Sequence, residues 1–292
     1  MMGSKVSVCA AVFVLWLQLQ LCFTFHIPKE LGGGSYWSRS IGVGATPQSS
    51  SESPPEIRLH AEAIRCKDDL IALAERTCRG FSASISDRDE AKRIISNLSM
   101  YNPSDEPASA YFRVNETPGI DRSTIAGKWT LIYTDAPDIT SLDGGALAMA
   151  KLGRIGQECS PPSIKNVIEW LRPDWASYLP FSGGETSRVL QKVCCEGSAT
   201  QDNPKVVDLR VVGVELLGLN GGDDFVGGEN IRKNNFLDGP ATLLEKNPVK
   251  LQGPLTAPFG KFEILYLDND MRVTKTFQGY LAVNIRDENP WF

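Results

Sequence analysis

The stretch at residues 261–286, KFEILYLDNDMRVTKTFQGYLAVNIR, decides the fold that the sequence predicts. Apolar and polar side chains alternate along it with a period of two, as they do in strands that bury one face. Asp-Asn-Asp at 268–270 and Gln-Gly at 278–279 interrupt the alternation with residues that favour turns. We therefore expect three antiparallel strands. The alternation places these side chains on one face of the first strand: Phe262, Ile264 and Tyr266.

Segments upstream of this stretch show the same pattern and are rich in valine and isoleucine. The expected strands lie at 128–134, 163–170, 187–196 and 205–215, and the glycine- and proline-rich stretch 218–260 predicts a loop. Successive short strands with no helices between them favour a closed barrel or a sandwich. We expect a mainly β domain at 121–292, an antiparallel barrel of about eight strands, which is just wide enough to hold one small ligand.

Residues 61–104 change to a helical period and predict a helical hairpin ahead of the barrel. Apolar residues at 62–79 fall mostly on one helical face, and Gly80 follows where a C-cap glycine belongs. Ser86 and Asp89 have the spacing of an approximate capping box before a second apolar stripe at 91–98. We expect this hairpin to pack on the barrel.

The N-terminal part of the chain is expected to be a targeting leader. Residues 1–24 join Lys5 to an apolar run, which predicts a signal peptide cut before Phe25, with an uncleaved membrane anchor as the alternative. Residues 25–60 are rich in serine and glycine and are expected to be disordered. Together they resemble the bipartite signal and transit leaders of algae with secondary plastids. Simple secretion is the alternative.

Composition argues against several classes of function. The net charge of −5 gives no basic footprint for nucleic acid. The chain has two histidines, His26 and His60, and both precede the expected core, which leaves no imidazole for a general base or a metal ligand. Five cysteines follow the leader without a CxxC pair, which fits neither a disulfide framework nor a zinc site. We expect a reducing compartment, no cofactor, no metal and no catalysis.

Several motifs, in order along residues 64–286, resemble the plastid lipid-associated protein (PAP), or fibrillin, family. They are KDDLI at 67–71, TCRG at 77–80, AGKWTLIYT at 126–134, LGRIGQ at 152–157, IKNVIEW at 164–170 and YLDNDMRV at 266–273. The resemblance implies a lipocalin-like barrel that binds carotenoids, quinones or related isoprenoid lipids. It also implies a location in the plastid stroma, with peripheral association with plastoglobules or the thylakoid surface. It does not indicate a protein partner.

The candidate ligand-binding residues are Trp129, Tyr133, Tyr266, Asp268, Asp270 and Arg272. Gly127-Lys128-Trp129 resembles the Gly-x-Trp of lipocalin barrels, where an arginine from a late strand stacks on the indole, and Arg272 or Arg286 is expected to do so here. Asp268 and Asp270 are expected to shape the hairpin turn, with an acid–base pair as the alternative. A cluster of Asp268, Arg272 and Tyr133 at the barrel mouth is a hypothesis for a ligand headgroup site.

Three functions are compatible with the sequence. The first is a protein that binds, stores or positions isoprenoid lipids in plastids. The second is an accessory protein or enzyme of isoprenoid or quinone metabolism that uses an acid cluster at the barrel mouth. The third is a secreted lipocalin, which the odd cysteine count disfavours.

Overall fold

The computed structural model describes residues 55–112, 125–142, 150–174, 187–219, 239–252 and 258–289. Apart from Pro55, these residues belong to one compact unit, Glu56–Phe292. The predicted signal peptide at 1–24 lies outside the described residues, and so does the predicted transit segment except for its last residues, where the first helix begins at Pro55. In the described part of the chain, none of the helices has the length and apolar character needed to span a bilayer.

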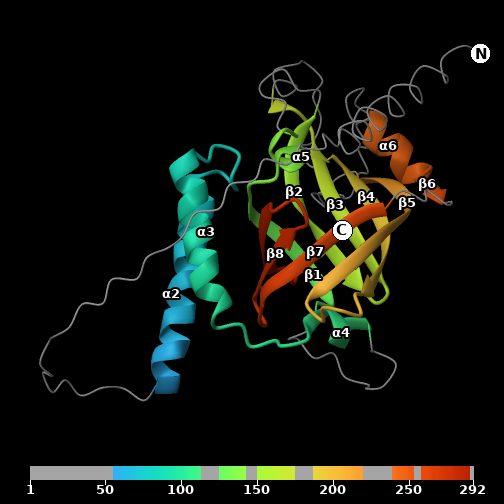
Figure 1. Cartoon of the computed structure of the whole chain (residues 1–292). Helices are drawn as coiled ribbons and strands as arrows, with labels where there is room; N and C mark the ends of the chain where they lie inside the picture. The colour runs from blue at the N-terminus through green and yellow to red at the C-terminus, as the bar shows by residue number, and fades with distance from the viewer. Residues whose placement is uncertain are drawn as a thin grey trace, which may run out of the picture. The chain divides into compact units, whose positions relative to one another are not determined.

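Nine antiparallel strands form one sheet that closes on itself (Figure 1). Their bounds are β1 Gly127–Thr134, β2 Lys151–Ser160, β3 Ser163–Leu171, β4 Arg188–Ala199, β5 Val206–Leu219, β6 Val249–Gln252, β7 Pro258–Leu267, β8 Met271–Thr276 and β9 Leu281–Arg286. The order is β4-β3-β2-β1-β9-β8-β7-β5-β6, and β4 also pairs with β5. Eight of the nine strands therefore form a ring, and β6 lies beside β5 alone. The predicted barrel is confirmed, while β2 and β6 were not predicted.

The strand register decides which side chains point into the interior of the ring, called the lumen below. Directly paired residues share a face of the sheet, and Trp129 of β1 pairs with Gln157 of β2 and Arg286 of β9. Trp129 packs in one buried cluster with Ile164 and Phe262 from β3 and β7. Side chains from strands around the ring meet in this way only inside it, so these residues face the lumen.

A β-bulge in β7 corrects one prediction from the sequence. The pairing with β8 shifts between Ile264 and Tyr266, which leaves Leu265 as the extra residue. Phe262 and Ile264 face the lumen, but Tyr266 pairs with Val273 on the outer face. The predicted single face for Phe262, Ile264 and Tyr266 is therefore wrong at its last member.

The predicted helical hairpin is present as α2 (Pro55–Arg76) and α3 (Ile85–Ser99). Leu70, Leu73, Ile94 and Leu98 are among its buried apolar residues, and they pack on outward-facing side chains of β1, β7, β8 and β9 (Figure 1). The capping box of α3 consists of Ser84 and Asp87, two residues before the predicted pair. The hairpin thus covers one outer face of the barrel and leaves the lumen free.

The connection from the hairpin to the barrel depends on Gly80. This residue has φ +93°, and a Cβ there would lie 2.0 Å from the carbonyl oxygen of Thr134. The adjoining Arg79 carbonyl accepts a hydrogen bond from the Thr134 amide at 3.1 Å. A side chain at position 80 would force the helical hairpin away from the end of β1.

Two short helices lie at the ends of the barrel, and α5 (Pro137–Thr140) follows β1. Ala108 and Tyr111 of α4 (Pro107–Phe112) join the buried lumen cluster, so α4 closes the end that contains Trp129. Helix α6 (Gly239–Lys246) packs on β5 and β4. Gly218 faces the lumen by register, and a Cβ there would lie 1.9 Å from the Ala241 carbonyl, so α6 lies across the lumen face at the end of β5. The loop predicted for 218–260 therefore contains a helix and a strand.

Candidate functional site

The closed end of the lumen is built around the indole of Trp129. Two guanidinium groups lie against this ring, with their Cζ atoms 4.8 Å (Arg272) and 4.3 Å (Arg286) from its centroid. The indole N–H donates to the Ile125 carbonyl at 2.7 Å. Gly127 has φ +125°, and a Cβ there would lie 2.5 Å from Nη1 of Arg286. The Gly-x-Trp motif therefore works as the sequence predicts, with both candidate arginines on the indole.

Arg272 is fully buried, and the groups that it bonds to or stacks on are uncharged. Its Nη2 donates to Oε1 of Gln157 at 2.5 Å, and its Nη1 lies 3.6 Å from the Cys159 sulfur. Its Nε has no hydrogen-bond partner within the described ranges. In the described part of the chain, no carboxylate forms an ion pair with this guanidinium. A buried cation without a counter-ion is costly, which makes this position the most unusual in the lumen.

The thiols and the phenol near the closed end are held in their neutral forms by burial. Burial raises the pKa of the Cys159 thiol, against the opposing effect of Arg272, and raises that of Cys195 to about 12. Burial also raises the pKa of Tyr111. Among the paired strand positions that face the lumen, none carries Asp, Glu or His. The described lumen therefore offers hydrogen bonds and apolar contact rather than an acid–base pair.

The far half of the lumen has an apolar wall, formed by inward-facing side chains of β3, β4 and β5. Its apolar members are Ile168, Trp170, Val189 and Leu216, and each is half-buried. The buried side chain of Gln191 lies among them and accepts a hydrogen bond from the Trp170 indole N–H at 3.0 Å. An inward side chain in a closed ring keeps accessible surface only where neighbouring side chains do not fill the space. The apolar wall is therefore less tightly covered than the end around Trp129, where the lumen residues are fully buried.

Three predicted site residues lie outside the barrel, against helix α2. The Asp268 carboxylate accepts hydrogen bonds from Lys67 Nζ at 2.8 Å and the Tyr266 hydroxyl at 2.7 Å. It also accepts from the turn amides of Asp270 and Met271. Burial opposes ionisation of Asp268, but these donors prevail and its pKa is lowered. Asp270 is exposed, 3.8 Å from Lys67. These residues form the hairpin turn, as expected, and fasten it to α2.

Tyr133 also lies outside, in the core between the hairpin and the barrel. Burial raises the pKa of its phenol to about 12, and none of the residues that the structure describes forms a hydrogen bond with its hydroxyl. The structure therefore does not bring Asp268, Arg272 and Tyr133 together, because Arg272 points into the lumen and the other two point out. The hypothesis of one mouth cluster is wrong in its geometry.

Two lumen residues that the sequence analysis passed over are Thr274 and Asn284. Both are buried, and the register places them on the same face as Arg272. The alternation in the sequence already placed Thr274 on the face of Arg272. Asn284 carried no such signal, because its strand was identified by its apolar residues.

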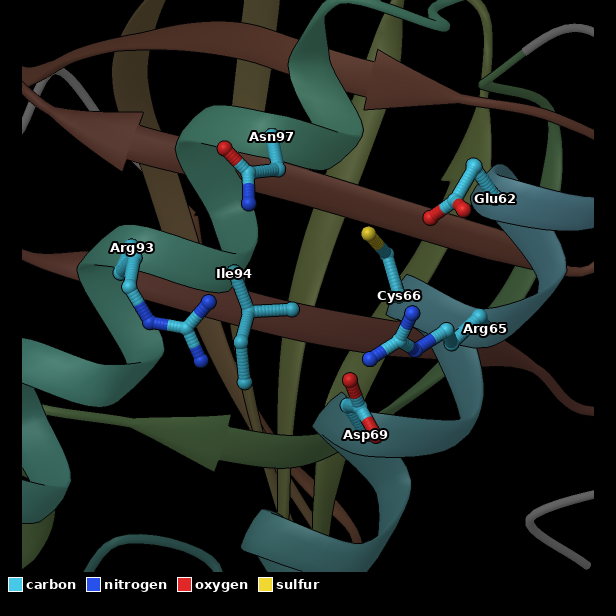
Figure 2. A pocket seen from close by; sticks show the side chains of 7 residues that line it. All are labelled: Glu62, Arg65, Cys66, Asp69, Arg93, Ile94 and Asn97. Carbon is cyan, nitrogen blue, oxygen red and sulfur yellow. The ribbon is translucent and has the colours of Figure 1, made fainter. Parts of the chain in front are cut away.

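A separate pocket of about 130 Å³ lies between α2 and α3 (Figure 2). Figure 2 shows Arg65 and Arg93 extending toward each other from the two helices, with Asp69 and Glu62 beside Arg65. Burial raises the pKa of the Cys66 thiol at its base, which keeps the sulfur protonated. The pocket is polar, of mixed charge and smaller than the roughly 300 Å³ of ordinary ligand sites. It is a poorer candidate than the lumen.

Comparison with known proteins gives one family and two relatives. The sequence model of the PAP_fibrillin family matches residues 64–284. A Citrus unshiu protein named "Plastid-lipid-associated protein, chloroplastic" is 24% identical over 256 residues, which cover 85% of this chain and 75% of that protein. An Arabidopsis thaliana protein named "Probable plastid-lipid-associated protein 2, chloroplastic" is 24% identical over 236 residues, which cover 78% of this chain and 73% of that protein.

Proposed function

The chain belongs to the PAP_fibrillin family, and on this premise we propose that it binds and positions an isoprenoid lipid inside its barrel, at the surface of a plastid membrane or lipid body. The observation that carries the proposal is the half-buried apolar wall of the lumen, opposite the packed end around Trp129. The names of both relatives support the plastid and the lipid.

The energetics of such a ligand favour binding in this lumen. Each methylene moved from water into an apolar site contributes about 0.8 kcal/mol. A few isoprene units therefore supply several kcal/mol before the cost of ordering the ligand is subtracted. The branched chain of an isoprenoid is complementary to a wall of isoleucine, valine and leucine.

We infer that the membrane contact lies at α6 and β6, beside the mouth of the barrel. Leu243, Val249 and Leu251 expose 52%, 39% and 51% of their surface. Val249 and Leu251 pair with inward-facing Leu216 and Val214, so they lie on the lumen side of the sheet. Exposed lysines at 246 and 250 flank them and suit an anionic lipid surface. A lipid would pass between this surface and the lumen without crossing water.

Binding rather than catalysis is the role we propose. The lumen-facing strand positions present no acid–base pair, and Asp268 and Asp270 point away from the lumen. An enzyme or accessory protein acting on isoprenoids is the second candidate from the sequence, but its acid cluster at the mouth is not assembled. We further propose plastid targeting through residues 1–60, which a fluorescent fusion of the full chain would test by its compartment.

A lumen-filling substitution tests the lipid-holding function. Ile168→Trp adds a bulky ring to the apolar wall, and Ser198→Trp on β4 adds the same ring to an exposed outward position as the matched control. Lipids that co-purify from a carotenoid- and quinone-producing host are identified by mass spectrometry. We expect the wild type and Ser198→Trp to retain prenyl lipid and Ile168→Trp to lose most of it. Equal retention by all three proteins, or no prenyl lipid on any of them, would refute lipid holding in the lumen.

A further inference from the structure

Three polar side chains form a continuous strip on the lumen face of β8 and β9. Arg272 pairs directly with Asn284, and Thr274 is the next inward residue of β8. Their exposed fractions are 0%, 4% and 8%. We call these three residues the polar wall.

The polar wall has hydrogen-bonding capacity that the protein does not use. Nε of Arg272 is buried and has no hydrogen-bond partner among the described residues. No hydrogen bond joins the Thr274 hydroxyl or the Asn284 amide to a described residue either, although these atoms are not fully enclosed as Arg272 Nε is. Buried polar groups are nearly always paired, and leaving one unpaired costs about 1–3 kcal/mol. The unpaired Nε of Arg272, with two further polar side chains beside it on the same face, therefore indicates a group from outside the chain.

The chemistry of the missing partner follows from the donors. Arg272 offers only N–H donors, and Asn284 and Thr274 can each donate as well. With no carboxylate beside Arg272, the complementary group is an oxygen acceptor such as a carbonyl, hydroxyl or carboxylate. The apolar wall, with Ile168 and Leu216, lies on the other strands of the same ring. The lumen thus has polar residues on β8 and β9 and a mainly apolar wall on β3, β4 and β5, where the buried Gln191 is an inward-facing polar residue.

We propose that the polar wall binds an oxygen-bearing headgroup, so that the barrel selects oxygenated isoprenoids over pure hydrocarbons and holds them head inward. This inference rests on the proposed lipid-holding function and adds to it the selectivity and orientation of the ligand. The headgroup oxygen satisfies Thr274, Asn284 and Arg272, while the prenyl chain runs along the apolar wall toward the mouth.

Three probes of six isoprene units each test the selectivity: a hexaprenyl benzoquinone, a hexaprenyl carboxylic acid and squalene, which has no oxygen. Affinities are measured for the wild type and for Thr274→Val/Asn284→Leu, which removes two polar groups with little change in volume. We expect the wild type to bind at least one oxygenated probe about tenfold more tightly than squalene, the value of one or two hydrogen bonds. The ratio between the quinone and the acid identifies the headgroup class.

The double variant keeps Arg272 and is expected to lose most, but not all, of this preference while keeping its affinity for squalene. Thr274→Ser keeps the hydroxyl and is the control, expected to keep the preference. Thermal unfolding of each variant checks that the barrel is intact. Equal affinity of the wild type for all three probes would overturn the headgroup site and leave lipid holding in place. Failure of every probe to bind would overturn the lipid-holding function itself.

Discussion

Replacing Asp268 with alanine removes the centre of the contact between the barrel and helix α2. Its carboxylate accepts from Lys67 at 2.8 Å, from Tyr266 at 2.7 Å and from two amides of its own turn. The Lys67 and Asp268 side chains expose 19% and 20% of their surface. This ion pair is therefore more buried than the exposed pairs that contribute about 0.2–1 kcal/mol.

We expect Asp268→Ala to lower the free energy of unfolding by about 3 kcal/mol, as the sum of a partly buried ion pair and several hydrogen bonds of about 0.5–1.5 kcal/mol each. Asp268→Asn keeps an oxygen for the turn amides and should cost less, about 1–2 kcal/mol. Lys67→Met in combination with Asp268→Asn measures the ion pair itself in a double-mutant cycle. The control is Asp89→Ala, because Asp89 forms an exposed pair with Lys92 and its loss should stay within about 0.5 kcal/mol.

The pH dependence of this contact has a definite sign. The pKa of Asp268 is lower in the folded chain than in the unfolded chain. The stabilisation that the Asp268 carboxylate provides is therefore complete above its pKa in the unfolded chain, about 3.9. This stabilisation is lost as the pH falls through its pKa in the folded chain. Urea unfolding at a series of pH values should show the difference between wild type and Asp268→Asn shrinking below about pH 4. A cost below about 1 kcal/mol for Asp268→Ala, or no coupling to Lys67, would refute this account of the contact.

Other substitutions and reagents test separate parts of the structure. Gly127→Ala should lower the free energy of unfolding by at least about 1–2 kcal/mol, because the residue has φ +125° and the new Cβ would displace Arg286. Denaturant unfolding measures this loss, and an unchanged stability would contradict the packing described for the indole. Leu251→Glu should weaken co-sedimentation with anionic vesicles, and unchanged binding would place the membrane contact elsewhere. Iodoacetamide at pH 8 should label the exposed thiol of Cys78 while sparing Cys195, whose pKa is raised to about 12; equal labelling rates would show that the lumen end is not closed.

Much of the barrel could be predicted from the sequence because its strands alternate cleanly. The alternation at 271–276 puts Arg272 and Thr274 on one face, and the structure has them there. The motif Gly127-Lys128-Trp129 also predicted a tertiary contact, the stacking of a late-strand arginine on the indole. In the structure the glycine makes room for Arg286, and both arginines stack on the indole. In each case the local pattern and the tertiary contact agree.

The parts that failed depend on features without a local pattern. The bulge at Leu265 adds one residue to β7 and reverses the faces that follow it, so counting by twos misplaced Tyr266. Strand β2 contains glycines at 153 and 156 and a second register shift, which hid its alternation. The mouth cluster failed because Asp268 and Arg272, four residues apart across a turn, lie on opposite faces of the sheet.

Mapping a photoactivatable ligand tests the central claim, that a prenyl lipid lies inside the barrel. A prenyl benzoquinone with a diazirine on its chain is irradiated with the protein, and the modified peptides are sequenced by mass spectrometry. The account predicts crosslinks at inward positions of the apolar wall, at Ile168, Val189 and Leu216. Crosslinks confined to α2 and α3, or to outward positions such as Ser198, would contradict it.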